Sequence, residues 1–392
     1  MAEWIECKIS DLGTVVGGAT PSTKKAENYE GGNIAWITPK DLSTFSGRYI
    51  QRGERNITEI GLKSCSTQLL PENTVLFSSR APIGYVAIAA NEVCTNQGFK
   101  SVIPNEATDP LFLFYLLKHN KDKIEAMGSG TTFKEVSGNT MKNIIVRVPS
   151  DKEVQNNIAS ILGTIDDKIE ENERINNNLE QQMQALYKAW FVDFVPFNGI
   201  KPTNWVNTDI YSIANIIYGA PFASKLFNTD GIGKPIIRIR DLKEQGFVTY
   251  TTEEHPKGHL IHPGDIVVGM DGEFRPYIWG NEKAWLNQRV CIFENKRPKG
   301  KAFLFYTIKP LLNMIEQTQV ATTVIHIGKK DFDSFEILLP SEDVLNQFDE
   351  ITTPMVEQIA NNRLENKRLS NLRDTLLPKL MSGELDVSDI DL

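Results

Sequence analysis

The chain has 392 residues, which is enough for two or three domains that each bury a core of their own. Its acidic N-terminus lacks the apolar stretch of a signal peptide, no apolar run reaches the length of a membrane span, and its four cysteines are scattered without a C-x-x-C pair. We therefore expect a cytoplasmic protein with reduced thiols.

The net charge of −8 at first argues against a nucleic-acid partner, but the acidic residues are unevenly distributed. Residues 1–150 carry 16 Lys and Arg against 15 Asp and Glu, and residues 196–340 carry 17 against 15. The stretches 151–195 and 341–392 are acidic, with 4 against 9 and 5 against 11. A slightly basic region can bind DNA through a local patch, so the composition permits a DNA partner without requiring one.

Short β-branched segments bounded by Gly, Pro and Asn predict strands in both halves of the chain. The predicted strands are 34–38, 74–78, 85–89, 144–148, 236–239, 265–268, 290–293 and 335–339. One amphipathic helix is expected in each half, at 110–126 and at 301–317. This mixture favours an α+β class, with β-rich units built on a curved sheet, over a repeating βαβ arrangement.

Residues 151–195 predict a long helix, because apolar residues and two asparagines recur at alternating steps of four and three, as in a coiled coil. These positions are Ile158, Leu162, Ile165, Ile169, Asn172, Asn176, Leu179, Met183, Leu186 and Trp190. A similar long helix is predicted after residue 341, and we expect Pro378 and the Ser382-Gly383 pair to end it. Its corresponding positions are Phe348, Ile351, Met355, Ile359, Asn362, Asn366, Leu369, Leu372, Leu376 and Leu380.

The two halves of the chain are loosely repeated. Residues 70–149 recur at 261–340 with a constant offset of 191. The matched segments include Asn96-Gln97 with Asn287-Gln288, Phe112–Tyr115 with Phe303–Tyr306, and Thr131-Thr132 with Thr322-Thr323. Two similar units, each followed by a similar helix, predict pseudo-twofold symmetry, which suits a roughly twofold partner such as duplex DNA.

The long helices repeat with an offset of 190, which places Asn172 and Asn176 on Asn362 and Asn366. Matched asparagines within a seam can hydrogen-bond each other in only one register, so we predict that these four residues align the two helices. The alternative is two unrelated surface helices with solvated asparagines. The predicted domains are 1–150, 151–195, 196–340 and 341–392, the second and fourth being the long helices with the C-terminal tail.

This organisation resembles the specificity (S) subunit of type I restriction-modification systems. The segments 77–88, 188–194 and 376–385 are also similar to segments of that family. The resemblance implies that each unit is a target recognition domain that reads one half of a bipartite double-stranded DNA site. It also implies that the helices pair antiparallel as a spacer and dock two modification (methyltransferase) subunits, with restriction (translocase-nuclease) subunits as further partners. The second unit departs from the family pattern, with residues 269–275 in place of the Ser-Ser-Arg-Ala-Pro run.

Catalytic signals are weak. The chain has no Pro-Pro pair of the kind an adenine methyltransferase needs beside the flipped base, and no phosphate-binding G-x-x-x-x-G-K-[ST] loop. Asp265 with Glu294 and Lys296 mimics a nuclease metal site, but a turn leading into a strand explains the aspartate more simply. The histidines at 255, 259 and 262 have metal-like spacing, yet neighbouring Pro and Gly favour a solvated loop. We expect no catalytic residue, no metal site and no cofactor.

Direct readout of DNA needs side chains that reach base edges: Arg or Lys for guanine, Asn or Gln for adenine, and the Thr methyl for thymine. The candidates in the first unit are Thr38, Lys40, Ser78, Arg80, Asn96, Gln97, Thr131, Thr132 and Lys134. Those in the second unit are Arg238, Arg240, Arg275, Asn287, Gln288, Arg289, Thr322 and Thr323. Pairs shared by both units can belong to the scaffold, and this favours Arg80, Arg275 and the arginines at 238 and 240 as base readers.

The sequence therefore predicts a non-catalytic DNA-targeting subunit. One alternative is a coiled-coil adaptor that binds two protein copies without reading bases, although such a protein would not need the Arg-, Asn- and Gln-rich loops. The other alternative is a metal-dependent nuclease, which would cut DNA as an isolated chain.

Overall fold

The computed structural model describes residues 3–130, 134–318 and 326–387. The chain divides into two compact units: unit 1 comprises Met1–Lys168 and Leu369–Leu392, and unit 2 comprises Ile169–Arg368. Each long helix therefore contributes to both units. Across the described part of the chain, no helix is both long and apolar enough to cross a membrane. The division of the chain into domains at residues 150, 195 and 340 stays a prediction.

Unit 1 is built on a five-stranded sheet in the order β2-β9-β6-β7-β4, whose neighbours are antiparallel except for β7 and β4. A three-stranded sheet, β5-β3-β8, and a two-stranded sheet, β1-β10, accompany it. The strands are β1 (Trp4–Lys8), β2 (Gly13–Gly17), β3 (Ile34–Ile37), β4 (Tyr49–Ile50), β5 (Arg55–Ile57), β6 (Val75–Ser79), β7 (Ile83–Ala89), β8 (Cys94–Thr95), β9 (Lys100–Pro104) and β10 (Ile145–Pro149).

The helices of unit 1 cover one part of this sheet. Helices α4 and α5 lie against β7, and Phe77 of β6 and Phe112 of α4 are fully buried in one core. Every residue of β6 is buried, as expected for a central strand that packs on both faces. The short helices are α1 (Ile9–Leu12), α2 (Pro39–Ser43), α3 (Glu59–Lys63), α4 (Pro110–His119), α5 (Lys121–Ala126) and α6 (Gly138–Asn143).

Unit 2 has a four-stranded antiparallel sheet in the order β12-β20-β17-β18, a five-stranded sheet β13-β15-β14-β19-β16, and a two-stranded sheet β11-β21. The strands are β11 (Val206–Asp209), β12 (Ala214–Tyr218), β13 (Phe227–Asn228), β14 (Lys234–Ile237), β15 (Tyr250–Thr251), β16 (Leu260–Ile261), β17 (Ile266–Gly269), β18 (Pro276–Ile278), β19 (Ala284–Leu286), β20 (Val290–Asn295) and β21 (Glu336–Leu339). Its helices are α8 (Lys301–Thr318) and α9 (Lys329–Phe332).

The two units share one framework. The order β2-β9-β6-β7 in unit 1 corresponds to β12-β20-β17-β18 in unit 2, and β1-β10 corresponds to β11-β21. In each unit a parallel pair stands in a separate sheet, β3 with β8 and β14 with β19. The eight predicted strands all appear in the structure, with ends shifted by at most two residues. The repeat in the sequence is thus a repeat in the fold.

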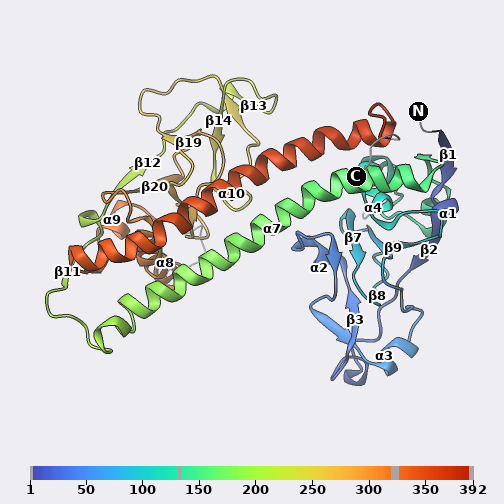
Figure 1. Cartoon of the computed structure of the whole chain (residues 1–392), viewed down its shortest axis with the longest axis horizontal. Helices are drawn as coiled ribbons and strands as arrows, with labels where there is room; N and C mark the ends of the chain where they lie inside the picture. Colours follow the sequence, from blue (N-terminus) through green and yellow to red (C-terminus); the bar gives the residue numbers. More distant parts are fainter. Residues whose placement is uncertain (1–2, 131–133, 319–325, 388–392) are drawn as a thin grey trace. The chain divides into compact units, whose positions relative to one another are not determined.

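The long helices are α7 (Lys152–Phe191) and α10 (Glu342–Ser382), drawn in green and red in Figure 1. Within unit 2 their contacts run antiparallel, because Asn172 bonds to Asn366, four residues later Asn176 bonds to Asn362, and the ring of Trp190 lies 5.7 Å from that of Phe348. Within unit 1 they share an apolar core to which α7 gives Ile158 and Leu162 and α10 gives Leu380 and Met381. The helices therefore pair with each other inside both units.

The structure corrects the predicted helix at 110–126. It is two helices, because α4 ends at His119 and α5 begins at Lys121, with Asn120 between them. The Asn120 side chain donates to the Leu116 carbonyl at 2.9 Å, which satisfies a carbonyl at the end of α4. The equivalent α8 is continuous although it contains Pro310.

The expectation that Pro378 ends the second long helix is wrong. Helix α10 passes through this proline and ends at Ser382, where Gly383 follows with a φ of +76°. Burial of Leu380 and Met381 in the core of unit 1 offsets the backbone hydrogen bond that a proline removes.

The predicted seam of α10 is also wrong at two positions. Ile351 is 43% exposed and Leu372 is 48% exposed, whereas the neighbouring Thr352 is fully buried. Helix α10 packs against the core of each unit as well as against α7, as Phe348 shows by lying in the core of unit 2. A helix with two packing surfaces does not follow a single coiled-coil spacing.

Candidate DNA interface

The Asn-Gln pair that both units share forms a turn after β8 and after β19. Asn96 Oδ1 accepts a hydrogen bond from the Gly98 backbone N–H at 2.8 Å, and Asn287 is buried. Both asparagines therefore serve the framework of their unit, because their side chains are turned into the turn or the interior. The adjacent Gln97 and Gln288 are exposed and remain candidates for DNA contact.

The structure contradicts Ser78 as a DNA contact. Its side chain is fully buried, its hydroxyl donates to the Pro82 carbonyl at 2.9 Å, and it accepts from the Tyr85 backbone N–H at 2.8 Å. The serine thus holds the connection between β6 and β7. A hydroxyl with both roles filled and no exposed surface cannot reach a base.

Two further candidates flank the start of α2. The Thr38 hydroxyl donates to Asp41 Oδ2 at 2.6 Å, so this side chain is occupied by a residue in the first turn of the helix. The Lys40 side chain is 79% exposed, and its Nζ lies 2.8 Å from Glu54 Oε2. This hydrogen bond raises the pKa of Lys40 and keeps the ammonium charged. Lys40 is the accessible member of this group.

The arginines of unit 2 differ in how firmly they are held. The Arg240, Arg275 and Arg289 side chains are 58%, 55% and 52% exposed. Arg238 is half-buried: it donates to the Thr249 hydroxyl and lies 5.8 Å from the centre of the Phe227 ring. Burial lowers the pKa of Arg238, since a buried guanidinium loses hydration.

Among the remaining candidates, Lys134 is exposed. Thr131, Thr132, Thr322 and Thr323 lie outside the described residues.

A charged cluster in unit 1 links Arg80 to residues that the sequence did not single out. Arg80 Nη1 lies 3.3 Å from Glu135 Oε2, and Lys100 Nζ lies 3.4 Å from Glu135 Oε1. Arg80 follows β6, Lys100 begins the neighbouring β9, and Glu135 lies beyond the segment 131–133. One carboxylate therefore holds two cations.

Unit 2 contains a similar cluster around Arg289. Asp271 Oδ1 lies 2.6 Å from His326 Nδ1 and 3.2 Å from Arg289 Nη1. Arg289 Nη1 also lies 3.2 Å from His326 Nδ1, so the three side chains are in mutual contact. Comparing the halves at the offset of 191 could have found these residues, because Arg80 matches Asp271 and Glu135 matches His326.

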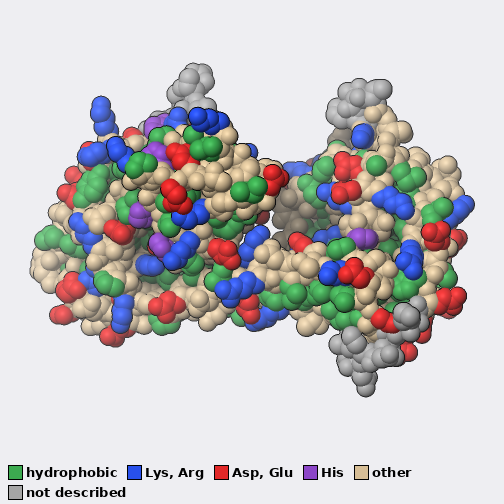
Figure 2. All heavy atoms as spheres, turned by 90° about the horizontal axis from the view of Figure 1, so that it is seen from above, with side chains coloured by type: hydrophobic (Ala, Val, Ile, Leu, Met, Phe, Trp, Pro, Cys, Tyr) green, Lys and Arg blue, Asp and Glu red, His purple; other side chains and the backbone are tan. Residues whose placement is uncertain are grey.

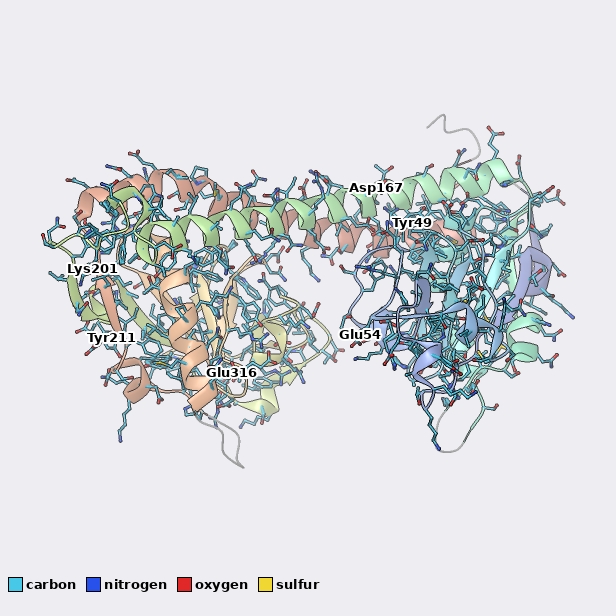
Figure 3. All side chains as sticks on the ribbon, turned by 90° about the horizontal axis from the view of Figure 1, so that it is seen from below. Tyr49, Glu54, Asp167, Lys201, Tyr211 and Glu316 are labelled. Atoms are coloured by element: carbon cyan, nitrogen blue, oxygen red, sulfur yellow. The ribbon has the colours of Figure 1, made fainter. Side chains whose placement is uncertain are left out.

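Charges of both signs are interspersed over the visible face of each unit in Figure 2. This fits the small positive net charges of residues 1–150 and 196–340. Figure 3 shows Asp167 of α7 and Tyr49 of β4 near each other in unit 1, where Arg48 pairs with Asp167 and lies 5.7 Å from the centre of the Tyr49 ring. Arg48 thus helps to hold helix α7 in unit 1.

The four helix asparagines bond to one another across α7 and α10 in unit 2. Asn172 Nδ2 donates to Asn366 Oδ1 at 2.8 Å, and Asn362 Nδ2 donates to Asn176 Oδ1 at 2.9 Å. Asn172 and Asn362 are almost fully buried. These two hydrogen bonds can form together in only one alignment of the two helices.

The residues considered for catalysis occupy structural positions. Asp265 Oδ2 accepts from the His262 backbone N–H at 2.7 Å, which closes the turn into β17. Glu294 Oε2 accepts from Asn215 Nδ2 at 3.0 Å between β12 and β20. Within the described ranges, no group of three or more His, Cys, Asp or Glu residues is placed to hold a metal ion.

Comparison with known proteins identifies a family and relatives that are similar to this chain. Residues 1–181 and 202–372 match the family described as the type I restriction modification DNA specificity domain. The chain is 34% identical over 99% of its length to the MjaIX specificity subunit of Methanocaldococcus jannaschii, of which it covers 95%. It is 24% identical over 98% of its length to the HindI specificity subunit of Haemophilus influenzae, of which it covers 100%.

Among solved structures, the S subunit of a type I restriction-modification system from M. genitalium has a similar fold. The TM-score is 0.63 at 17% sequence identity, over 97% of this chain and 96% of that one. The match at both halves of the sequence and the likeness along the whole fold agree with the duplicated framework of units 1 and 2. The chain belongs to the family of type I restriction-modification specificity subunits and has two recognition domains.

Proposed function

We propose that this specificity subunit binds a bipartite double-stranded DNA site, with unit 1 reading one half and unit 2 reading the other. The observation that carries the proposal is that the two units share one framework but differ in their exposed chemistry. Where unit 1 has the Ser-Ser-Arg-Ala-Pro run at the end of β6, unit 2 has the segment 269–275 at the end of β17. Different exposed side chains on the same framework suit the reading of two different sequences.

The proposed contacts are the accessible basic and amide side chains. In unit 1 they are Lys40, Arg80, Gln97 and Lys134, and in unit 2 they are Arg238, Arg240, Arg275, Gln288 and Arg289. Asn96, Asn287 and Thr38 belong to the framework, and the four threonines outside the described residues stay predicted contacts. Affinity would come mainly from phosphates, and discrimination from the few side chains that reach base edges.

The helices α7 and α10 dock two modification subunits, which carry out the methyl transfer, and restriction subunits join for cleavage. The chain itself is the non-catalytic member of this complex and acts in the cytoplasm, where these partners meet DNA. The acidic composition of residues 151–195 and 341–392 supports this division, because acidic helices are repelled by phosphates and leave the DNA to the recognition domains.

The direct test is methylome sequencing of a host with and without this chain, in the presence of its modification subunit. We expect one split sequence motif to be methylated only when the chain is present. Methylation at a continuous motif, or none that depends on the chain, would contradict the proposal.

A second experiment separates the two readers. Residues 1–150 are exchanged for the corresponding residues of a relative, and the methylated motif is determined again. One half of the motif should change while the other stays the same. If both halves change, or neither does, the two-reader model fails.

A further inference from the structure

The charged clusters of the two units occupy equivalent places in the framework. In unit 1 the Val136 backbone N–H donates to the Ser79 carbonyl at 3.0 Å, and in unit 2 the Ile327 N–H donates to the Met270 carbonyl at 2.9 Å. Each residue of the second pair lies 191 positions after its counterpart. The residues next to these bonds, 80 with 135 and 271 with 326, are therefore structural equivalents.

Acidic and basic side chains are exchanged between the equivalent positions. Unit 1 has Arg80 on the sheet side and Glu135 on the loop side, whereas unit 2 has Asp271 on the sheet side and His326 on the loop side. Every residue of the pair differs between the units, yet a carboxylate faces a basic side chain in both.

A second basic side chain joins each pair from the strand next in the sheet. Lys100 comes from β9, which neighbours β6, and Arg289 directly precedes β20, which neighbours β17. Both clusters thus consist of one carboxylate and two basic side chains. The two clusters therefore have the same composition at equivalent places in the fold, although the residues that form them differ.

Stability alone is a weak reason for this recurrence. The Arg80 and Glu135 side chains are 36% and 38% exposed, and those of Arg289 and Asp271 are 52% and 22% exposed. Ion pairs with this much solvent contact contribute about 0–1 kcal/mol. Arg80 and Arg289, one cation in each cluster, are also candidate DNA contacts, so the carboxylates face groups that DNA would use.

We propose that Glu135 and Asp271 are specificity-determining residues: each holds two basic side chains and keeps them from binding the phosphates of non-target DNA. The inference rests on the proposed DNA binding. A carboxylate and a phosphate are recognised by the same Arg and Lys donors, so the internal carboxylate competes with any phosphate that arrives. Non-specific affinity depends almost entirely on such phosphate contacts, and weakening it raises the ratio of target to non-target binding.

The test measures binding of the full-length chain to a fluorescent random-sequence duplex as salt is varied. Glu135→Gln and Asp271→Asn keep side-chain shape and remove the charge. Each should tighten binding to random DNA roughly fivefold at about 0.1 M salt and steepen the logarithmic salt dependence by about one, as expected for one additional phosphate contact. Arg80→Gln added to Glu135→Gln should remove most of the gain, since Arg80 is more exposed than Lys100.

Two matched controls separate this local effect from a change in net charge. Glu92→Gln in unit 1 and Asp230→Asn in unit 2 remove one exposed carboxylate each, and neither side chain has a hydrogen bond or ion pair among the described residues. Both controls should bind random DNA as the unaltered chain does. Circular dichroism of every variant checks that the fold is retained, and the two units provide independent variants.

Three outcomes would overturn the inference. They are unchanged or weaker binding of both Glu135→Gln and Asp271→Asn, an equal gain in the controls, or a gain that persists in full when Arg80 is also removed. None of them touches the proposed bipartite recognition, which the methylome decides separately.

Discussion

The arginines of unit 2 are not equivalent as candidate readers of DNA bases, because their surroundings hold them to different degrees. Arg238 is fixed by Thr249 and by the face of Phe227. Arg275 lies in the segment that replaces the Ser-Ser-Arg-Ala-Pro run of unit 1, and the Glu273 carboxylate lies 3.6 Å from it. A loosely held guanidinium costs little to redirect, so Arg275 is the better candidate for a base contact.

Arg275→Ala should therefore weaken binding of the assembled complex to its own site by about 1–3 kcal/mol if the side chain makes a bidentate guanine contact. Discrimination should relax at one base pair in one half of the site. Fluorescence anisotropy on a panel of singly substituted duplexes measures this. Equal weakening on target and random DNA would instead identify Arg275 as a phosphate contact.

For single residues, the sequence identified polar and charged candidates but did not reveal which of their side chains are used by the fold itself. The offset of 191 matched Asn96 with Asn287, and their side chains belong to the framework. Ser78 stands in a sequence typical of a polar loop, but it is fully buried near the end of β6, where its hydroxyl bonds to Pro82 and Tyr85 and its backbone pairs with Phe99. Burial depends on such tertiary contacts, and local composition does not record them.

The long helices are held to unit 1 by a charged group that unit 2 replaces with apolar residues. Asp166 of α7 accepts from Tyr115 Oη at 2.6 Å and from Arg373 Nη1 of α10 at 2.7 Å. Burial, followed by the charge of Asp166, raises the pKa of Tyr115, so its hydroxyl stays protonated and donates. The positions 190 residues away from Asp166 and Arg373 are Val356 and Met183, both in the core of unit 2.

Asp166→Ala should destabilise the chain by about 1–3 kcal/mol, because the buried Tyr115 hydroxyl loses its acceptor and Arg373 keeps only Asp374 as a carboxylate partner. The triple change Asp166→Val, Arg373→Met and Tyr115→Phe installs the two apolar helix residues of unit 2 and removes the donors that would be left without Asp166. Unit 2 keeps a tyrosine, Tyr306, at the position of Tyr115, where its hydroxyl donates to the Glu180 carbonyl. The triple change should be nearly neutral or stabilising. Chemical denaturation of all variants measures the difference, and a triple variant as unstable as Asp166→Ala would show that the two sites are not interchangeable.

The buried asparagines of unit 2 predict a different pattern. Asn362→Leu leaves the side-chain oxygen Oδ1 of Asn176 without its donor and should lower the free energy of unfolding by about 1–3 kcal/mol. Asn176→Leu together with Asn362→Leu should recover much of this loss, because an apolar pair fits a helix seam, while the alignment of the helices becomes less specific. Urea denaturation measures the stability, and loss of one sharp unfolding transition in the double variant would report the mixed alignments. A double variant that loses stability additively would contradict this reasoning.

Whole elements were predictable where the signal lay in the local pattern. Eight of the strands and the existence of both long helices followed from spacing and from turn residues, whereas two-residue strands such as β4 and β13 were not predicted. The break at Asn120 and the continuation of α10 through Pro378 depended on what the helices pack against, and these neighbours come from distant parts of the chain. A single seam was expected for α10 because a local pattern cannot reveal a second packing surface.

At the scale of the whole molecule, one framework used twice explains how a single chain can recognise two half-sites. Each unit has its own apolar core, and segment 269–275, which differs between the units, carries the exposed charges of Glu273 and Arg275. Specificity can therefore change in one unit without repacking the other. The long helices are the element common to both units, so they are expected to set the distance between the half-sites.

The last prediction tests this role of the helices. Seven residues are inserted into α7 after Lys168 and seven into α10 before Leu369, where the chain passes from one unit to the other. A heptad keeps the apolar spacing and lengthens a helix by about 10 Å at about 1.5 Å per residue, which equals roughly three base pairs of DNA. The methylated motif should keep the same bases in both halves while the gap between them grows by about three. A matched variant with heptads of identical composition inserted after Gly199, outside the helices, should leave the gap unchanged. If the helix variant folds and methylates DNA with the original gap, the helices do not set the distance between the half-sites.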